Sequence, residues 1–169
     1  MIRIASLAIF AAVLAAPAIA DSHLSEEAAY GADAFGKCAA CHVVADAEGN
    51  TIAGKKAKSG PNLYGVYGRA AGSSEGFKYS KSLLAAGEAG LVWDEETLTA
   101  FIQDPTKFLR AYLDDSKARS KMSFKARADK KAGLSAEEVA ERFAEFLEEV
   151  GPEMDDDDDD DDDDDGMTN

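Results

Sequence analysis

Five consecutive residues constrain this chain of 169 residues more than any other feature. They read Cys38-Ala39-Ala40-Cys41-His42, and the spacing C-x-x-C-H is the attachment signature of c-type haem. Thiols three positions apart lie on one face of a helical turn, so both can bond to one edge of the same macrocycle. The histidine that follows then lies under the iron and ligates it. The motif therefore predicts one covalent haem c, attached through Cys38 and Cys41, with His42 as an axial ligand.

Two other kinds of site use the same residue types, a redox-active dithiol and half of a zinc site. A zinc site needs further Cys or His ligands, but the chain holds only these two cysteines and one other histidine, His23. A thioredoxin-like dithiol lies beside a βαβ pattern, and the sequence shows no alternating strand runs. Thioether bonds to haem also explain so short a spacing better than a structural disulfide does. Haem attachment is therefore the favoured interpretation.

Both ends of the chain are expected to lie outside the folded domain. Residues 1–20 have the pattern of a secretory signal peptide, with Arg3 ahead of an apolar run and Ala18-Ile19-Ala20 as the cleavage site. The run is shorter than the ~20 residues of a membrane span. We expect cleavage after Ala20 and no stable membrane insertion, with a retained anchor as the alternative. Residues 153–169 contain eleven consecutive aspartates and are expected to form a disordered tail.

The acidic character of the chain belongs mainly to this poly-Asp tail. The whole chain has a net charge of −15, and removing Arg3, Glu153 and the eleven aspartates leaves about −4. The expected domain, residues 21–152, is therefore only mildly acidic, and nucleic acid is not an expected partner.

Helical patterns recur along the domain and are separated by long polar segments. Helix starts are marked by side-chain caps or a first-turn proline at Ser25, Asp94, Pro105 and Ser135. The first helix is expected over residues 26–39, and loops are expected at 43–60, 72–82 and 114–131. An all-α domain with loops this long is unusual unless something fills the space between its helices, and a haem does.

A haem iron with one histidine has a second axial position, where methionine raises the potential. Met1 leaves with the signal peptide, and Met154 and Met167 flank the aspartates, so only Met122 lies in the domain. Elimination predicts Met122 as the distal ligand, with simple core packing as the alternative. His23 is a weaker candidate because chain termini are rarely tied down.

Taken together, these motifs resemble the class I cytochromes c, in particular the bacterial periplasmic cytochrome c2 group. The resemblance spans about residues 31–150. It rests, in chain order, on Gly31-x-x-x-Phe35, Cys38-x-x-Cys41-His42, Gly60-Pro61-Asn62-Leu63-Tyr64-Gly65, Gly68-Arg69, Phe77-x-Tyr79, Trp93, Pro105, Lys121-Met122-x-Phe124 and Phe146-Leu147.

The resemblance implies a small all-α class I cytochrome c fold wrapped around the haem, with His42 and Met122 as the metal ligands. It also implies that the Pro61 carbonyl accepts a hydrogen bond from the other ring nitrogen of His42. Gly31 would lie where the first and last helices cross, against Phe146. The implied donors to the haem propionates are Arg69, Tyr79 and Trp93.

The implied function is a soluble, monomeric periplasmic one-electron carrier rather than an enzyme, since both axial positions of the iron are filled. The implied donor is a cytochrome bc-type complex, and the acceptor is a terminal oxidase or a photosynthetic reaction centre. If Met122 does not ligate the iron, the alternative is a haem-based gas-binding sensor or a peroxidase-like enzyme. A thiol oxidoreductase without haem is a more distant alternative.

Residues 117–131 carry seven basic side chains and one acidic one, Asp129. Because Met122 lies among them, we expect a basic ring at the haem edge that steers acidic redox partners, with a solvated loop as the alternative. Its members are Lys117, Arg119, Lys121, Lys125, Arg127, Lys130 and Lys131.

Three features depart from the family pattern. The segment 104–122 is longer than in mitochondrial cytochromes c, so a looser approach to the distal ligand is expected. Phe101 stands where the family often has a tyrosine, and loss of that hydroxyl would change the potential. The poly-Asp tail has no counterpart; we expect it to aid solvation, with folding back onto the basic ring or weak cation binding as alternatives.

Overall fold

The computed structural model describes residues 24–152, so the expected signal peptide (1–20) and poly-Asp tail (153–169) lie outside the described part of the chain. The elements are α1 (Glu26–Ala34), the 3-10 helix η1 (Phe35–Lys37), β1 (Val43–Ala45), β2 (Thr51–Gly54), α2 (Lys81–Glu88), α3 (Glu95–Gln103), α4 (Pro105–Tyr112) and α5 (Ala136–Glu149). The prediction of a helical domain with long loops is confirmed. Among these elements, none is a helix with the length and apolar character of a membrane span.

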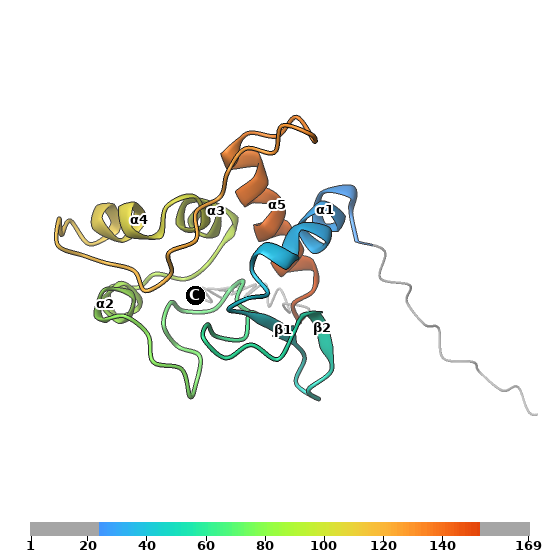
Figure 1. The fold of residues 1–169 in the computed structure, drawn as a ribbon. Helices are drawn as coiled ribbons and strands as arrows, with labels where there is room; N and C mark the ends of the chain where they lie inside the picture. Colours follow the sequence, from blue (N-terminus) through green and yellow to red (C-terminus); the bar gives the residue numbers. More distant parts are fainter. Residues whose placement is uncertain (1–23, 153–169) are drawn as a thin grey trace, which may run out of the picture.

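Helix α5 is the element around which the others are arranged. Both α1 and α3 pack against it, α4 follows α3 directly, and α2 contacts α4 on the far side (Figure 1). The inward face of α5 supplies the largest fully buried side chains, Phe143 and Phe146, and the Phe35 ring lies 5.6 Å from that of Phe146. The segment 113–135 has no helix or strand and runs across α3 and α4 before α5 begins.

All four predicted helix starts are confirmed. Ser25 Oγ accepts from the Ala28 amide at 3.0 Å, and Asp104 caps α4, with Pro105 at its first position. Both α3 and α5 begin with reciprocal capping boxes, which the N-cap residues Asp94 and Ser135 form. Each such cap satisfies backbone N–H groups that a helix start leaves unpaired.

The structure differs from the sequence prediction in three local respects. The first helix ends at Ala34 and continues only as the 3-10 turn η1, because the chain must turn to present the cysteines. The loop expected at 43–60 contains the antiparallel pair β1–β2, whose strands are too short to show alternation. Helix α2 was not predicted; Ser80 caps it, but it is only eight residues long, contains Gly87 and is followed closely by Gly90, and glycines weaken a helical pattern.

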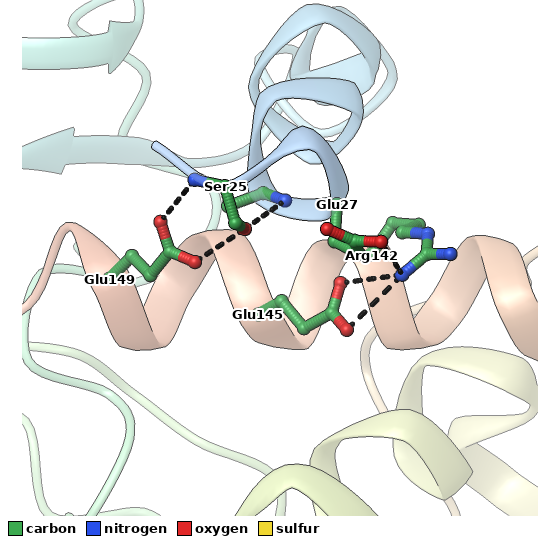
Figure 2. A network of polar contacts seen from close by, with 6 residues as sticks. Ser25, Glu27, Arg142, Glu145 and Glu149 are labelled. Carbon is green, nitrogen blue, oxygen red and sulfur yellow. Dashed lines mark hydrogen bonds and ion pairs between the residues drawn. The ribbon is translucent and has the colours of Figure 1, made fainter. Parts of the chain in front are cut away.

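Helices α1 and α5 cross in close contact at Gly31, as the resemblance implied. A Cβ built at Gly31 would overlap the Arg142 carbonyl oxygen and lie 2.7 Å from Phe146 Cβ. Polar contacts flank the crossing (Figure 2). Glu149 accepts from the Ser25 amide at 3.0 Å and from its hydroxyl, while Arg142 lies 3.7 Å from Glu27 and also pairs with Glu145. These contacts hold the two ends of the domain together.

We expect Gly31→Ala to destabilise the fold by about 1–3 kcal/mol, because the backbones of α1 and α5 must separate to admit the methyl group. Gly36→Ala is the matched control, since a Cβ at Gly36 meets nothing within 4 Å. Denaturant unfolding of both variants measures the difference. Equal free energies of unfolding in the two variants would contradict the assigned crossing.

Candidate functional site

The two cysteines and His42 lie on one turn of chain directly after η1. The amides of Cys41 and His42 both donate to the Cys38 carbonyl, at 3.0 and 2.9 Å. The Gly60 amide donates to the Cys41 carbonyl at 2.7 Å, which joins this turn to the Gly60-Pro61 segment. The helical turn that the motif requires is therefore present, and a hydrogen bond from Gly60 holds its C-terminal end.

The His42 ring is held by two neighbouring residues. Its Nδ1 lies 2.9 Å from the Pro61 carbonyl oxygen. A carbonyl only accepts, so Nδ1 carries the proton and Nε2 keeps a lone pair for a metal. The ring also lies flat against Gly60, where a Cβ would come within 2.6 Å of Nδ1. Burial lowers the pKa of His42, and the Pro61 hydrogen bond opposes this shift, so the ring is neutral at pH 7.

Two cavities meet at His42. The larger, of about 360 Å³, falls in the ~300–1,000 Å³ range of cofactor sites. The smaller, of about 80 Å³, has apolar walls from α3, α5 and neighbouring segments. Residues common to both linings are Cys38, His42, Phe101, Met122 and Phe124. Both sequence-predicted iron ligands and one attachment cysteine therefore line the same space, and Cys41 lines the larger cavity.

Met122 is brought to this space by an irregular segment that is fastened on both sides. On the N-terminal side the Met122 amide donates to Ser120 Oγ at 3.0 Å, and the Ser120 amide donates to Thr106 Oγ1 at 3.3 Å. On the C-terminal side the Ala126 amide donates to the Ile102 carbonyl at 2.9 Å. These contacts hold the methionine segment on both sides, whereas its length led us to expect a looser approach to the distal ligand position.

The junction of α3 and α4 provides a further fastening that the sequence analysis did not identify. Asp104 Oδ1 accepts from the Lys107 amide and caps α4, while Oδ2 pairs with Lys125 Nζ at 2.5 Å. The hydrogen bond from Lys125 holds the pKa of the Asp104 carboxyl below its ordinary value. Lys125 is three residues from Met122, so one carboxylate both starts a helix and anchors the methionine segment.

The three residues expected at the propionates lie in different surroundings. Tyr79 lines the larger cavity, with its ring 4.8 Å from Phe77. Trp93 is buried in the wall of the smaller cavity, 5.0 Å from Phe101. Arg69 lines neither cavity; its guanidinium donates to the carbonyls of Tyr64 and Asn62, and desolvation lowers its pKa. The structure thus brings Tyr79 and Trp93 to the cavities and ties Arg69 to the backbone nearby.

Gly60 is a second site residue that the sequence analysis quoted only as part of a motif. The signal for it was its position before Pro61, but nothing in the sequence shows that a ring packs on its Cα. For Asp104 the sequence showed only its place before Pro105, and its pairing with Lys125 depends on contacts between segments that the sequence alone does not place.

The residues of this site fit a covalent haem. The donors are two thiols, an imidazole Nε2 and a thioether, and a largely apolar wall surrounds the space between the last two. Burial raises the pKa of the Cys38 thiol to about 11. A protonated, buried thiol is a poor redox nucleophile at neutral pH, which argues against the dithiol alternative. The described residues also contain no cluster of three His, Cys, Asp or Glu that could hold a metal ion.

Comparisons with known proteins agree with this fit, although no protein-family model matches the chain. Cytochrome c2 of Cereibacter sphaeroides is 48% identical over 128 residues, covering 75% of this chain and 86% of that protein. Cytochrome c2 of Rhodovulum adriaticum is 54% identical over 109 residues, 64% of this chain and 86% of that protein. The chain belongs to the cytochrome c2 family.

A solved structure supports the same assignment at the level of the fold. The crystal structure of cytochrome c2 from Rhodobacter sphaeroides superposes with a TM-score of 0.66 at 46% identity, over 75% of this chain and 97% of that one. The class I cytochrome c fold, the covalent haem c and the role of electron carrier are therefore confirmed for this member of the cytochrome c2 family.

We expect Gly60→Ala to displace the His42 ring from the Pro61 carbonyl. Loss of an outer-shell partner of a metal-bound histidine typically costs ~10- to 100-fold in metal affinity, so the variant should unfold at a lower temperature in its haem-loaded form. Pro61→Ala is the control, because it keeps the backbone carbonyl. Thermal unfolding followed by circular dichroism measures both. A similar fall in unfolding temperature in the two variants would show that the close approach of Gly60 to the His42 ring is unimportant.

We expect Asp104→Asn to lower stability at pH 7 by less than about 1 kcal/mol, since asparagine still caps α4 and only the pairing with Lys125 is lost. A carboxyl whose pKa is lowered in the folded state stabilises the fold above its ordinary pKa. The difference from the unmutated protein should therefore fade as the pH falls below about 4.

Denaturant unfolding at pH 7 and pH 3 measures this difference. Lys125→Gln should reproduce the loss at pH 7, whereas Lys130→Gln, which removes the same charge without this partner, should not. A difference that persists undiminished at pH 3 would contradict the role of the ion pair.

Proposed function

We propose that this chain is a soluble periplasmic carrier of single electrons, whose haem iron is ligated by His42 Nε2 and Met122 Sδ. The observation that carries the proposal is that His42 and Met122 both line each of the two adjoining cavities. When bound, haem c supplies an iron that exchanges one electron between its ferric and ferrous states. Arg69, Tyr79 and Trp93 are proposed to act at the propionate side.

The contribution of the protein is to keep these residues in place in both oxidation states. Pro61 fixes the tautomer of the His42 ring, and the bonded segment 120–126 holds Met122 in the lining of the same cavities, where it would ligate the iron. A site with little freedom to rearrange favours fast electron transfer and disfavours binding of a substrate at the metal. The apolar wall keeps the polarity around the metal low, which tunes its potential.

The proposed partners are a cytochrome bc-type complex as donor, and a terminal oxidase or a photosynthetic reaction centre as acceptor. Their docking site is the basic ring around Met122, whose seven cations are all exposed. Two of them have partners in the described structure: Lys125 pairs with Asp104, and Lys121 Nζ donates to the Lys78 carbonyl at 2.6 Å. The single acid, Asp129, accepts from Tyr30 and from two backbone amides, so its charge is partly satisfied within the domain.

The chain is further proposed to reach the periplasm by cleavage after Ala20, which leaves the domain of residues 21–152 and the tail. Mass spectrometry of the exported protein tests this directly, since it gives the residue at which the mature chain begins.

We expect Met122→Leu to abolish the ferric absorption band in the red that marks methionine–iron ligation in this family. Leucine has a similar volume, so the fold should persist. The potential should fall by a sizeable part of the ~0.8 V range that axial ligands span, and the ferrous form should bind carbon monoxide readily. Absorption spectra with a redox titration measure these changes, with Ser123→Ala as the control.

Spectra of the unmutated protein give the result that would contradict this prediction. If it lacks the band at neutral pH and binds carbon monoxide as readily as the variant, Met122 is not a ligand. The gas-binding or peroxidase-like alternative would then apply.

A further inference from the structure

The poly-Asp tail is the feature of the sequence that the proposed function does not use. Its eleven aspartates begin three residues after Pro152, and seventeen residues follow Pro152 in all. The described chain ends beside Gly65, where a Cβ would lie 3.2 Å from Pro152 Cδ. The structure therefore fixes the point on the domain from which this negative charge starts.

A cluster of three lysines lies near this point. Lys55, Lys56 and Lys58 follow strand β2 within four residues, and each is exposed. Lys55 and Val150, at the end of α5, line the same surface hollow of about 510 Å³. Within residues 24–152 none of the three lysines forms an ion pair. The cluster is therefore available to an acidic segment.

Two carboxylates on adjoining elements, Asp46 and Glu149, are hydrogen-bonded to groups other than the three lysines. Asp46 accepts from the Asn50 amide and side chain, at 2.8 and 2.9 Å. Glu149, in the last turn of α5, accepts from the amide and hydroxyl of Ser25 (Figure 2). Neither of these two acids forms an ion pair with the three lysines in residues 24–152.

We propose that the aspartates of the tail, residues 155–165, dock on the cluster formed by Lys55, Lys56 and Lys58. An extended chain spans ~3.3–3.6 Å per residue, so the first aspartate lies within about 11 Å of Pro152 along the chain and the last within about 47 Å. A short tether holds the charges at an effective concentration of the order of millimolar. The contact is electrostatic and must weaken as salt rises.

The basic ring is a less favourable place for the tail. Val139, in the first turn of α5, lines a hollow with Lys130 and Lys131, at the opposite end of that helix from the tail. To reach it the aspartates must run the length of α5, about 21 Å for its 14 residues, toward the exposed Glu137 and Glu138 of its first turn. Repulsion along this path favours the nearer lysine cluster.

Docking on the cluster has a consequence for the site, and this consequence rests on the proposed electron-carrier function. Lys58 is followed by Ser59 and Gly60, which line the larger cavity beside His42. A docked tail places negative charge next to the cavity mouth and reduces the local attraction for acidic partners. The tail then slows association at low salt and is released at high salt.

Zero-length carbodiimide cross-linking of the full haem-loaded chain tests the contact without using its redox activity. The reaction is run at micromolar protein in about 10 mM and about 1 M salt, where screening lengths are ~30 and ~3 Å. Mixing labelled and unlabelled protein separates links within a chain from links between chains. We expect links from residues 155–165 to Lys55, Lys56 or Lys58 that disappear at high salt. Links concentrated at Lys130 and Lys131, links spread evenly over exposed lysines, or no links would each overturn the proposal.

A cycle of variants tests the consequence. Replacing all eleven aspartates by serine should raise the oxidation rate by hexacyanoferrate(III), an anionic probe, several-fold at low salt. In a background carrying Lys55→Gln, Lys56→Gln and Lys58→Gln the same replacement should have a clearly smaller effect. The matched control carries Lys78→Gln, Lys81→Gln and Lys107→Gln, three exposed lysines outside both the cluster and the basic ring, so it removes equal charge elsewhere, and the effect of the tail should persist in it.

An undiminished effect of the tail in the first background would show that only net charge matters and would overturn the proposal. If the unmutated protein exchanges no electrons with the probe, the proposed function fails instead, while the cross-linking result still decides the docking.

Discussion

The structure depends above all on the packing of the His42 ring between Gly60 and the Pro61 carbonyl. This contact joins the C-x-x-C-H turn to the segment after β2, fixes which ring nitrogen carries the proton, and holds in place a ring that lines both cavities. A side chain at position 60 would occupy the place of the ring. The haem site therefore depends on a missing Cβ as much as on the groups that bind.

The second constraint acts on Met122, which lines both cavities from a long segment without regular structure. Such a segment holds a side chain in place only if its backbone and flanks are bonded to rigid elements. The junction between α3 and α4 provides this support through Asp104 and Thr106, and the carbonyl of Ile102 adds a backbone bond. The helices are thus arranged so that their ends, rather than their faces, hold the methionine segment.

Much of this architecture could be predicted because it depends on residues that are close together in the sequence. Helix caps depend on residues three apart, and the C-x-x-C-H motif depends on one turn, so both are visible in the sequence. Met122 could be predicted as the distal ligand by elimination, because the expected domain has one methionine. The short strands, helix α2 and the pairing of Asp104 with Lys125 could not be predicted, since they depend on contacts between distant segments. The hydrogen bonds from Arg69 to the carbonyls of Tyr64 and Asn62 could not be predicted for the same reason.

The central proposal is that His42 and Met122 ligate one iron together in this member of the cytochrome c2 family. The most direct measurement is a crystal structure of the haem-loaded ferric protein, with anomalous diffraction used to locate the iron. We expect the iron to lie between His42 Nε2 and Met122 Sδ, with thioether bonds from Cys38 and Cys41 to the macrocycle. An iron whose sixth position is open, or is filled by a group other than Met122, would contradict the account.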